Sequence, residues 1–230
     1  MIKQLDALIF DVDGTLAETE EAHRLSFNTA FAEAALDWDW SQALYRELLK
    51  VTGGKERIRH FLEREAIPVG DDTASLIGRL HARKTEIYTA RVIAGEVAFR
   101  PGITELIQQA RRRRVALGIA TTTSRTNVEA LITACLGARA MIWFVAVICG
   151  DMVPAKKPAP DVYVAALETL GVPASRAVAV EDSENGIRAA RAAGIAVIAT
   201  PSLYCAADDF SEATVLVSDS TQIGSALRWT

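Results

Sequence analysis

Two aspartates follow a short apolar segment near the start of the chain. The segment Leu5–Phe10 leads into Asp11 and Asp13, after which come Gly14 and Thr15. Side chains alternate in direction along a strand, so the two carboxylates leave the strand end on the same side. Carboxylates held this close repel each other unless a divalent cation lies between them or one of them carries a proton. Phosphoryl-transfer chemistry uses both conditions, and the glycine then allows the backbone to turn sharply away.

Two other interpretations of this motif have to be weighed. A calcium loop of the EF-hand type places its glycine at the sixth loop position, between flanking helices. Counting from Asp11, Gly14 is only the fourth residue, and an apolar strand precedes it. The second alternative is an acidic strand end without a function, which would suffice if the motif stood alone.

Composition excludes several classes of partner. The chain has 230 residues, half of them hydrophobic, with a net charge of −4 and a pI near 5.5. A chain without a basic excess is a poor candidate for nucleic-acid binding. No apolar run reaches the roughly 20 residues needed to cross a bilayer, and the first residues lack the pattern of a secretion signal. We therefore expect a cytoplasmic protein that binds neither nucleic acid nor membrane. The oligomeric state is open, with a monomer as the expectation.

Hydrophobic patterns divide the chain into one helical stretch and one alternating stretch. Apolar segments of strand length lie at Leu5–Phe10, Val115–Ala120, Ile142–Ile148, Ala177–Val180, Ala196–Ala199 and Thr214–Val217. Helical segments are expected at Glu20–Ala35, Ile103–Arg113 and Arg125–Leu136, and more of them between residues 36 and 94. Alternation of short strands with helices predicts an α/β fold, with a Rossmann-like, mostly parallel sheet covered on both faces. Residues 1–16 and 97–230 would form this core, and residues 17–96 an inserted, all-helical cap domain.

Reactive side chains follow several of the expected strands. Thr121, Thr122, Thr123 and Ser124 follow the second strand; Lys156 and Lys157 come after the third; Glu181 and Asp182 end the fourth. Each group has a simpler explanation when taken singly, as a helix cap or as exposed lysines. Because ligands of parallel sheets bind beyond the carboxyl ends of the strands, all of these groups are expected at one site.

The order and spacing of these groups resemble the four motifs of the haloacid dehalogenase superfamily. The first motif would be the segment that carries Asp11 and Asp13, and the others Thr121, Lys157, and Glu181 with Asp182. The helical insertion is similar to the cap of the subgroup that includes phosphoglycolate phosphatases and β-phosphoglucomutases. The resemblance extends over the whole chain.

This resemblance implies a nucleophile, an acid/base and a metal site. Asp11 would attack the phosphorus and become an aspartyl-phosphate, and Asp13 would carry the proton. Magnesium would be held by Asp11, by the backbone carbonyl of Asp13 and by Asp182. Glu181 would orient a metal-bound water. A proton carrier at Asp13 argues against dehalogenation, because a departing halide needs no proton.

The same resemblance implies groups that bind the phosphoryl oxygens. Thr121 and the amide of Thr122, with Thr123 and Ser124 beside them, would hold these oxygens at the start of a helix. Lys157 would offset the charge that builds up during transfer. Lys156 is the rival for this task, but the superfamily places its lysine immediately before the proline, which favours Lys157.

The expected cap carries a second set of polar residues. Glu20 and His23 are three apart, so they share a helix face directed at the core. Two glycines precede two cations at a helix start, an arrangement suited to an anion. The residues in question are Thr52, Gly53, Gly54, Lys55 and Arg57.

These cap residues, together with Tyr45 and the segment beginning at Arg100, are similar to the CbbY group of phosphatases associated with carbon fixation. That resemblance implies a xylulose-1,5-bisphosphate phosphatase, which removes an inhibitor of Rubisco. The second phosphate would lie near Lys55, Arg57 and Arg100. Glu20 and His23 would bind sugar hydroxyls, with Tyr45 as a further candidate, although an aromatic residue in a helical cap often belongs to its core.

Three rival functions follow from the same motifs. A β-phosphoglucomutase-like phosphomutase would pass the phosphoryl group to a second sugar, and a phosphatase could act on another small sugar phosphate. A phospho-accepting signalling domain also places acids, threonine and lysine around magnesium. Such receiver domains carry the acceptor on a middle strand and lack a helical insertion, which argues against this alternative.

Overall fold

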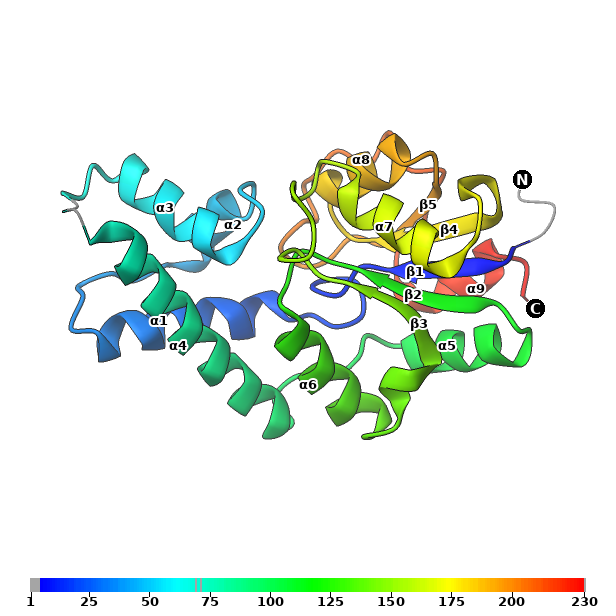
Figure 1. Ribbon diagram of the computed structural model, residues 1–230, viewed down its shortest axis with the longest axis horizontal. Helices are drawn as coiled ribbons and strands as arrows, with labels where there is room; N and C mark the ends of the chain where they lie inside the picture. The colour runs from blue at the N-terminus through cyan, green and yellow to red at the C-terminus, as the bar shows by residue number, and fades with distance from the viewer. Residues whose placement is uncertain (1–4, 69, 71, 230) are drawn as a thin grey trace.

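The computed structural model describes residues 5–68, 70 and 72–229. Within these residues six parallel strands form one sheet in the order β3-β2-β1-β4-β5-β6 (Figure 1). The strands are β1 (Ala7–Phe10), β2 (Ala116–Ala120), β3 (Phe144–Ile148), β4 (Ala177–Glu181), β5 (Ala196–Ala199) and β6 (Val215–Leu216). The α/β fold with a parallel sheet is therefore confirmed.

Both faces of the sheet are covered by helices, because its strands are apolar on both sides. In β1, Leu8 and Phe10 belong to one hydrophobic cluster and Ala7 and Ile9 to another. The first cluster includes residues of α5 (Ile103–Arg112) and α6 (Arg125–Leu136), and the second residues of α7 (Asp161–Leu170) and α8 (Glu184–Ala192). The short α9 (Ile223–Ala226) completes the first layer.

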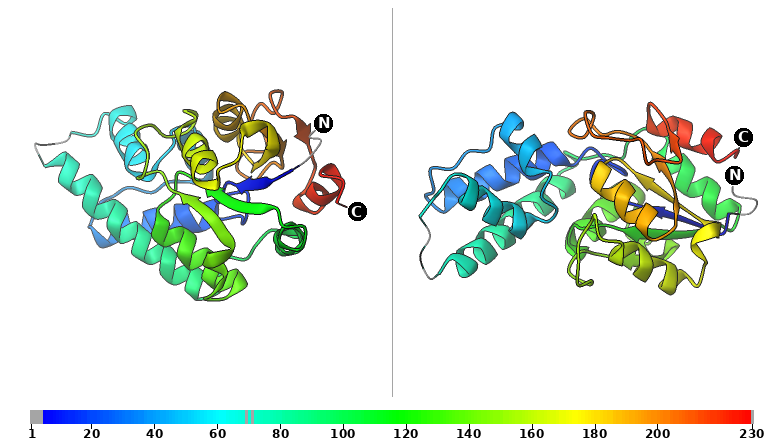
Figure 2. Two further views of the ribbon diagram at one scale, coloured as in Figure 1. Left: turned by 45° about the vertical axis from the view of Figure 1, so that its right-hand side comes forward. Right: turned by 90° about the horizontal axis from the view of Figure 1, so that it is seen from above.

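Four helices lie together at one end of the molecule (Figure 1). They are α1 (Glu20–Glu33), α2 (Gln42–Leu48), α3 (Gly54–Arg64) and α4 (Thr73–Ile93). An aromatic cluster forms their interior: Phe27, Phe31 and Trp40 contact one another, and Phe61 packs against Trp40. The long α4 continues alongside α6, so that Tyr88 and Val92 pack with the core of the sheet (Figure 2).

Two crossing segments join the helical cap to the sheet. The backbone of Ala17 pairs with Asp13 on one side and with Phe99 on the other. The cap therefore leaves the sheet directly after the two aspartates, at the carboxyl ends of the strands. This connection brings cap side chains within reach of the carboxylates.

Some predicted element boundaries were wrong. Ile142 and Trp143 lie in a 3-10 helix, Ala140–Trp143, and the strand begins only at Phe144. The last strand is reduced to two residues, Val215 and Leu216. In both places apolar residues extend beyond the segment that pairs with a neighbouring strand.

No helix in the described part of the chain is long and apolar enough to span a membrane.

Candidate active site

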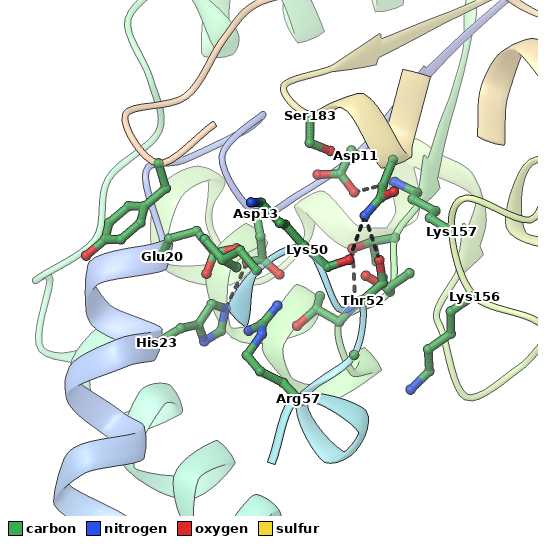
Figure 3. Close-up of a pocket in the computed structure, with 18 of the residues that line it drawn as sticks. Asp11, Asp13, Glu20, His23, Lys50, Thr52, Arg57, Lys156, Lys157 and Ser183 are labelled. Carbon is green, nitrogen blue, oxygen red and sulfur yellow. Dashed lines mark hydrogen bonds and ion pairs between the residues drawn. The ribbon is translucent and has the colours of Figure 1, made fainter. Parts of the chain in front are cut away.

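The ends of four strands deliver polar side chains to one cavity of about 390 Å³ between the sheet and the cap. The core residues that line it include Asp11, Asp13, Thr121, Lys157 and Asp182. Figure 3 shows Asp11, Asp13 and Lys157 on one side of the cavity, with cap residues such as Glu20, His23 and Arg57 on the other. Parallel strands bring these side chains together because all their carboxyl ends meet at the same edge of the sheet.

Lys157 lies between two carboxylates. Its Nζ is 2.6 Å from Oδ1 of Asp11 and 2.6 Å from Oε1 of Glu181. Burial alone would lower the pKa of this lysine, but the two carboxylates outweigh burial and raise it above its ordinary value. Figure 3 shows Lys156 pointing away from this cluster. Its Nζ lies 2.7 Å from Oε1 of Glu56 in the cap. The geometry therefore assigns the position beside the expected nucleophile to Lys157.

Three carboxylates form a compact oxygen-rich group. Oxygens of Asp11, Glu181 and Asp182 all lie within 4.8 Å of one another. Burial, together with the charges of its acidic neighbours, raises the pKa of Asp11 to about 8 and that of Asp182 well above its ordinary value. A cation nearby would favour the ionised forms of all three; Lys157 would then offset one of the charges, and the remaining two match a divalent cation. Oxygen ligands are those that Mg²⁺ prefers, so the residues present fit this ion.

Glu181 is fully buried and does not line the cavity. Besides Lys157, it accepts hydrogen bonds from the hydroxyl of Tyr163 at 2.5 Å and from the amide of Asp182 at 3.3 Å. A Cβ on Gly186 would lie 2.0 Å from one of its oxygens, so only glycine fits there. Glu181 therefore holds Lys157 in place, in addition to its membership of the acidic group. Tyr163 was missed in the sequence, where it is one of several apolar residues in its helix.

Asp13 is held by the cap. Its Oδ1 accepts a hydrogen bond from the hydroxyl of Thr19 at 2.7 Å and lies 3.0 Å from Nε2 of His23. Nδ1 of this histidine is 2.7 Å from Nζ of Lys84. An ammonium group can only donate, so Nδ1 accepts and the proton on Nε2 is donated to Asp13.

The pKa values agree with this chain of hydrogen bonds. Burial and the charge of Lys84 lower the pKa of His23, which keeps the ring neutral. Burial by itself raises the pKa of Asp13, but the bonds from His23 and Thr19 outweigh it and bring the pKa below its ordinary value. Burial also lowers the pKa of Lys84 to about 8.

Lys84 was missed in the sequence analysis, although a signal existed. It occupies a position on the buried side of α4, in line with Leu80 and Tyr88. A lysine in an apolar stripe requires a partner, and here that partner is His23, whose ring also stacks on Tyr88 with 3.9 Å between the centroids.

The turn after β2 offers donors at the cavity wall. Thr121, Thr122, Thr123 and Ser124 all line the cavity. The amide of Thr123 donates to the hydroxyl of Thr121 at 3.2 Å. The hydroxyl of Ser124 caps α6 by accepting a hydrogen bond from the amide of Asn127. Ser124 is thus engaged in its own helix. The start of this helix lies at the cavity wall, and a helix start favours an anion.

Most of the expected cap residues also line the cavity. These are Glu20, His23, Thr52, Gly53, Gly54, Lys55 and Arg57. Cations that the sequence analysis did not single out join them, namely Arg46, Lys50 and Arg188.

Tyr45 was expected to bind substrate, but it does not line the cavity. Its ring belongs to the interior of the cap. Its hydroxyl donates to Glu20 at 2.8 Å and accepts from Arg57 at 3.0 Å. Tyr45 therefore orients two cavity residues from behind.

The expectation that Arg100 binds the second phosphate is wrong in this geometry. Arg100 does not line the cavity, and its guanidinium binds elsewhere. It donates to the carbonyls of Gly14, Thr200 and Pro201 at 2.5 to 2.9 Å and to the hydroxyl of Thr200 at 3.1 Å. The side chain ties together loops beside the cap connection, and all of its acceptors are distant in sequence.

This clamp predicts a structural effect. Replacing Arg100 by Met should lower the free energy of unfolding by roughly 2 to 3 kcal/mol, because several buried carbonyls lose charged donors. Urea denaturation measures the change, with Arg112→Met, at the exposed end of α5, as the control. An unchanged midpoint for Arg100→Met would show that the clamp contributes nothing to stability.

Comparisons with known proteins agree with this geometry. The family model described as haloacid dehalogenase-like hydrolase matches residues 5–194. Protein CbbY of Cereibacter sphaeroides is 49% identical over 220 residues, which cover 96% of this chain and 94% of that protein. The crystal structure of a CbbY variant from Rhodobacter sphaeroides with xylulose-1,5-bisphosphate is 48% identical, with a TM-score of 0.90 and coverage of 96% and 97%.

A more distant structure shows how widely the fold is shared. The β-phosphoglucomutase of Clostridium difficile is 16% identical and superimposes with a TM-score of 0.80, covering 98% of this chain and 96% of that one. The expected similarity to the subgroup that includes β-phosphoglucomutases is thus confirmed at the level of the fold. The chain belongs to the haloacid dehalogenase-like hydrolases, is similar to the CbbY proteins over nearly its whole length, and is a phosphoric monoester hydrolase.

Proposed function

We propose that this enzyme is a Mg²⁺-dependent phosphatase that converts xylulose-1,5-bisphosphate to xylulose 5-phosphate through an aspartyl-phosphate on Asp11. The single observation that carries the proposal is the position of Asp11. It lies in a cavity that also has cations on its cap side, 2.6 Å from Lys157 and within the acidic group.

In the first step an oxygen of Asp11 forms a bond to phosphorus while the bond from phosphorus to the sugar oxygen breaks. Lys157 and the amides that follow β2 offset the charge on the transferring phosphoryl group. Magnesium, held by Asp11, the carbonyl of Asp13 and Asp182, would supply further positive charge at the phosphoryl oxygens. Splitting the displacement into two steps makes each of them easier.

Asp13 moves the proton in both steps. His23 and Thr19 both bond to Oδ1, which leaves Oδ2 for the substrate. An anionic phosphate nearby raises the pKa of a carboxyl group, so substrate binding favours the protonated form that donates to the leaving sugar oxygen. Asp13 is then a carboxylate and takes a proton from the water that attacks the aspartyl-phosphate.

A bisphosphate fits the distribution of charge in the cavity. One phosphate would lie at Asp11, and the other would lie against the cap, near Lys55 and Arg57. Glu20, which also lines the cavity, would accept hydrogen bonds from sugar hydroxyls. Both ring nitrogens of His23 are already bonded, to Asp13 and to Lys84, so we expect His23 to position Asp13 and not to bind the sugar as the sequence suggested. The complex of the 48% identical CbbY variant with xylulose-1,5-bisphosphate supports this choice of substrate. Hydrolysis of xylulose-1,5-bisphosphate would remove an inhibitor of Rubisco.

A phosphate-release screen tests the proposal. Ketose and aldose monophosphates and bisphosphates are offered with Mg²⁺, and we expect a marked preference for xylulose-1,5-bisphosphate. Equal rates on all substrates would refute the choice of substrate. Transfer to a second sugar without release of phosphate would instead show a phosphomutase.

Lys55 is expected to distinguish a bisphosphate from a small monophosphate. Lys55→Ala should raise KM for the bisphosphate about 10-fold, because one charge-assisted contact to the second phosphate is lost. A small monophosphate that does not reach the cap should be hydrolysed as before. Arg59→Ala, an exposed cation of the same helix, is the control. Equal losses on both substrates would show that the second phosphate does not bind near Lys55.

A further inference from the structure

An acid occurs where the second phosphate is expected to bind. Glu56 lies between Lys55 and Arg57 at the start of α3. A carboxylate at such a place opposes an anion unless it is neutralised. Its Oε1 lies 2.7 Å from Nζ of Lys156, a core residue, so the pair joins the cap to the core. The charge of Lys156 and its hydrogen bond outweigh burial and lower the pKa of Glu56 below its ordinary value.

Gly53 makes room for this ion pair. Its φ of +101° is one that other residues rarely adopt. A Cβ at this position would lie 2.2 Å from Oε2 of Glu56 and 2.7 Å from Nζ of Lys156. The glycine therefore serves the contact between cap and core, in addition to opening the loop toward the cavity.

A second contact holds the same loop from another part of the core. Asn185, in the first turn of α8, donates through Nδ2 to the carbonyl of Lys50 at 3.2 Å and to the hydroxyl of Thr52 at 3.3 Å. Residues 50–57 are thus tied to the core at two points. Asn185 lies three residues after Asp182, so one tie starts close to the acidic group.

We propose that Glu56, Lys156 and Asn185 form a latch that closes the cap and positions residues 50–57 over the substrate. These are positioning residues, because they act through the loop that would hold the second phosphate. The inference rests on the proposed function. A loosened latch therefore weakens binding of a substrate that reaches the cap and leaves a small substrate less affected.

Glu56→Gln separates the latch from simple electrostatics. If Glu56 were only a nearby acid, removing its charge would favour a second phosphate and lower KM for xylulose-1,5-bisphosphate. The latch predicts the opposite, a rise in KM of about 2- to 5-fold, the range expected for a partly exposed ion pair. The kcat for a small aryl phosphate should stay within about 2-fold. High salt should reduce the difference between the variant and the wild type, because it screens the pair.

Matched variants complete the test. Glu33→Gln removes an ion pair with Arg83 that lies wholly within the cap at 2.6 Å, and it should leave KM unchanged. Glu56→Lys should weaken binding further than Glu56→Gln, and adding Lys156→Glu should restore part of the loss by re-forming the pair with reversed charges. A lower or unchanged KM in Glu56→Gln, or no restoration in the double variant, would overturn the latch.

Hydrogen exchange of the substrate-free protein tests the latch independently of activity. Amides of residues 50–57, such as that of Arg57 bonded to the carbonyl of Gly53, should exchange faster in Glu56→Gln and Asn185→Ala than in the wild type or Glu33→Gln. Equal exchange in all four proteins would refute the latch. Absence of phosphate release by the wild type would refute the proposed function instead, and the exchange data would still be interpretable.

Discussion

Asp11→Asn is expected to reduce phosphate release by at least about 10³-fold, because an amide cannot form the bond to phosphorus that the first step requires. Lys157 would keep its contact with Glu181, so the lysine remains in place. Single-turnover assays with xylulose-1,5-bisphosphate measure the loss, and circular dichroism checks the fold.

Two comparisons make this result specific. Asp37→Asn, an exposed carboxylate of the cap, should release phosphate at the wild-type rate. Trapping experiments with labelled substrate should detect a phosphorylated wild-type protein and none in Asp11→Asn. Wild-type turnover in Asp11→Asn would contradict the whole mechanism, since every later step requires the phosphoryl group on Asp11.

Removal of divalent cations is expected to abolish turnover, and addition of Mg²⁺ should restore it. The acidic group of Asp11, Glu181 and Asp182 offers more carboxylates than Lys157 can neutralise when they are ionised, so a cation that binds the folded protein should also stabilise the fold. We expect Mg²⁺ in excess over its Kd to raise the midpoint of thermal unfolding by a few degrees, roughly 2 to 4 °C.

Asp182→Asn provides the control for the metal site. Its side chain keeps the size of aspartate but lacks the charge, so the thermal shift on adding Mg²⁺ should largely disappear. Glu105→Gln, an exposed acid of α5 that does not line the cavity, should retain the shift. Full activity in the presence of a strong chelator, or an identical shift in Asp182→Asn, would exclude the acidic group as the site.

Ionisation of Asp11 and Asp182 should be coupled to the binding of Mg²⁺. Burial raises the pKa of Asp11 to about 8 and raises that of Asp182 as well, so these carboxylates resist ionisation in the free protein. A cation nearby favours the charged forms. Binding of Mg²⁺ should therefore release protons, and the acidic group and the nucleophile should respond to the metal together.

Local sequence patterns were sufficient to locate the residues at the strand ends. Asp11, Thr121, Lys157 and Asp182 each follow an apolar segment, and the geometry of parallel strands then requires that they meet. The segment boundaries were less certain, as at Ile142, because apolar character alone does not show where strand pairing begins. The prediction of a parallel sheet rests on the order of strands and helices along the chain, so errors of a few residues in their boundaries do not change it.

The partners of long polar side chains could not be obtained in this way. Arg100 reaches carbonyls that are about a hundred residues away in the sequence, and no local pattern records such a contact. Tyr45 and Lys84 both lie on the buried sides of their helices, and their contacts with Glu20 and His23 depend on how these helices pack against α1. Lys156 and Lys157 are neighbours in sequence, yet one contacts the cap and the other Asp11.

Strand period and element order are local properties, and they sufficed to predict a parallel sheet with acids, threonine and lysine at its strand ends. The set of cap residues at the cavity, the chain from Lys84 through His23 to Asp13, and the pair of Glu56 with Lys156 became known from the folded arrangement alone. These contacts join segments far apart in the chain, and their geometry depends on how the cap rests on the sheet.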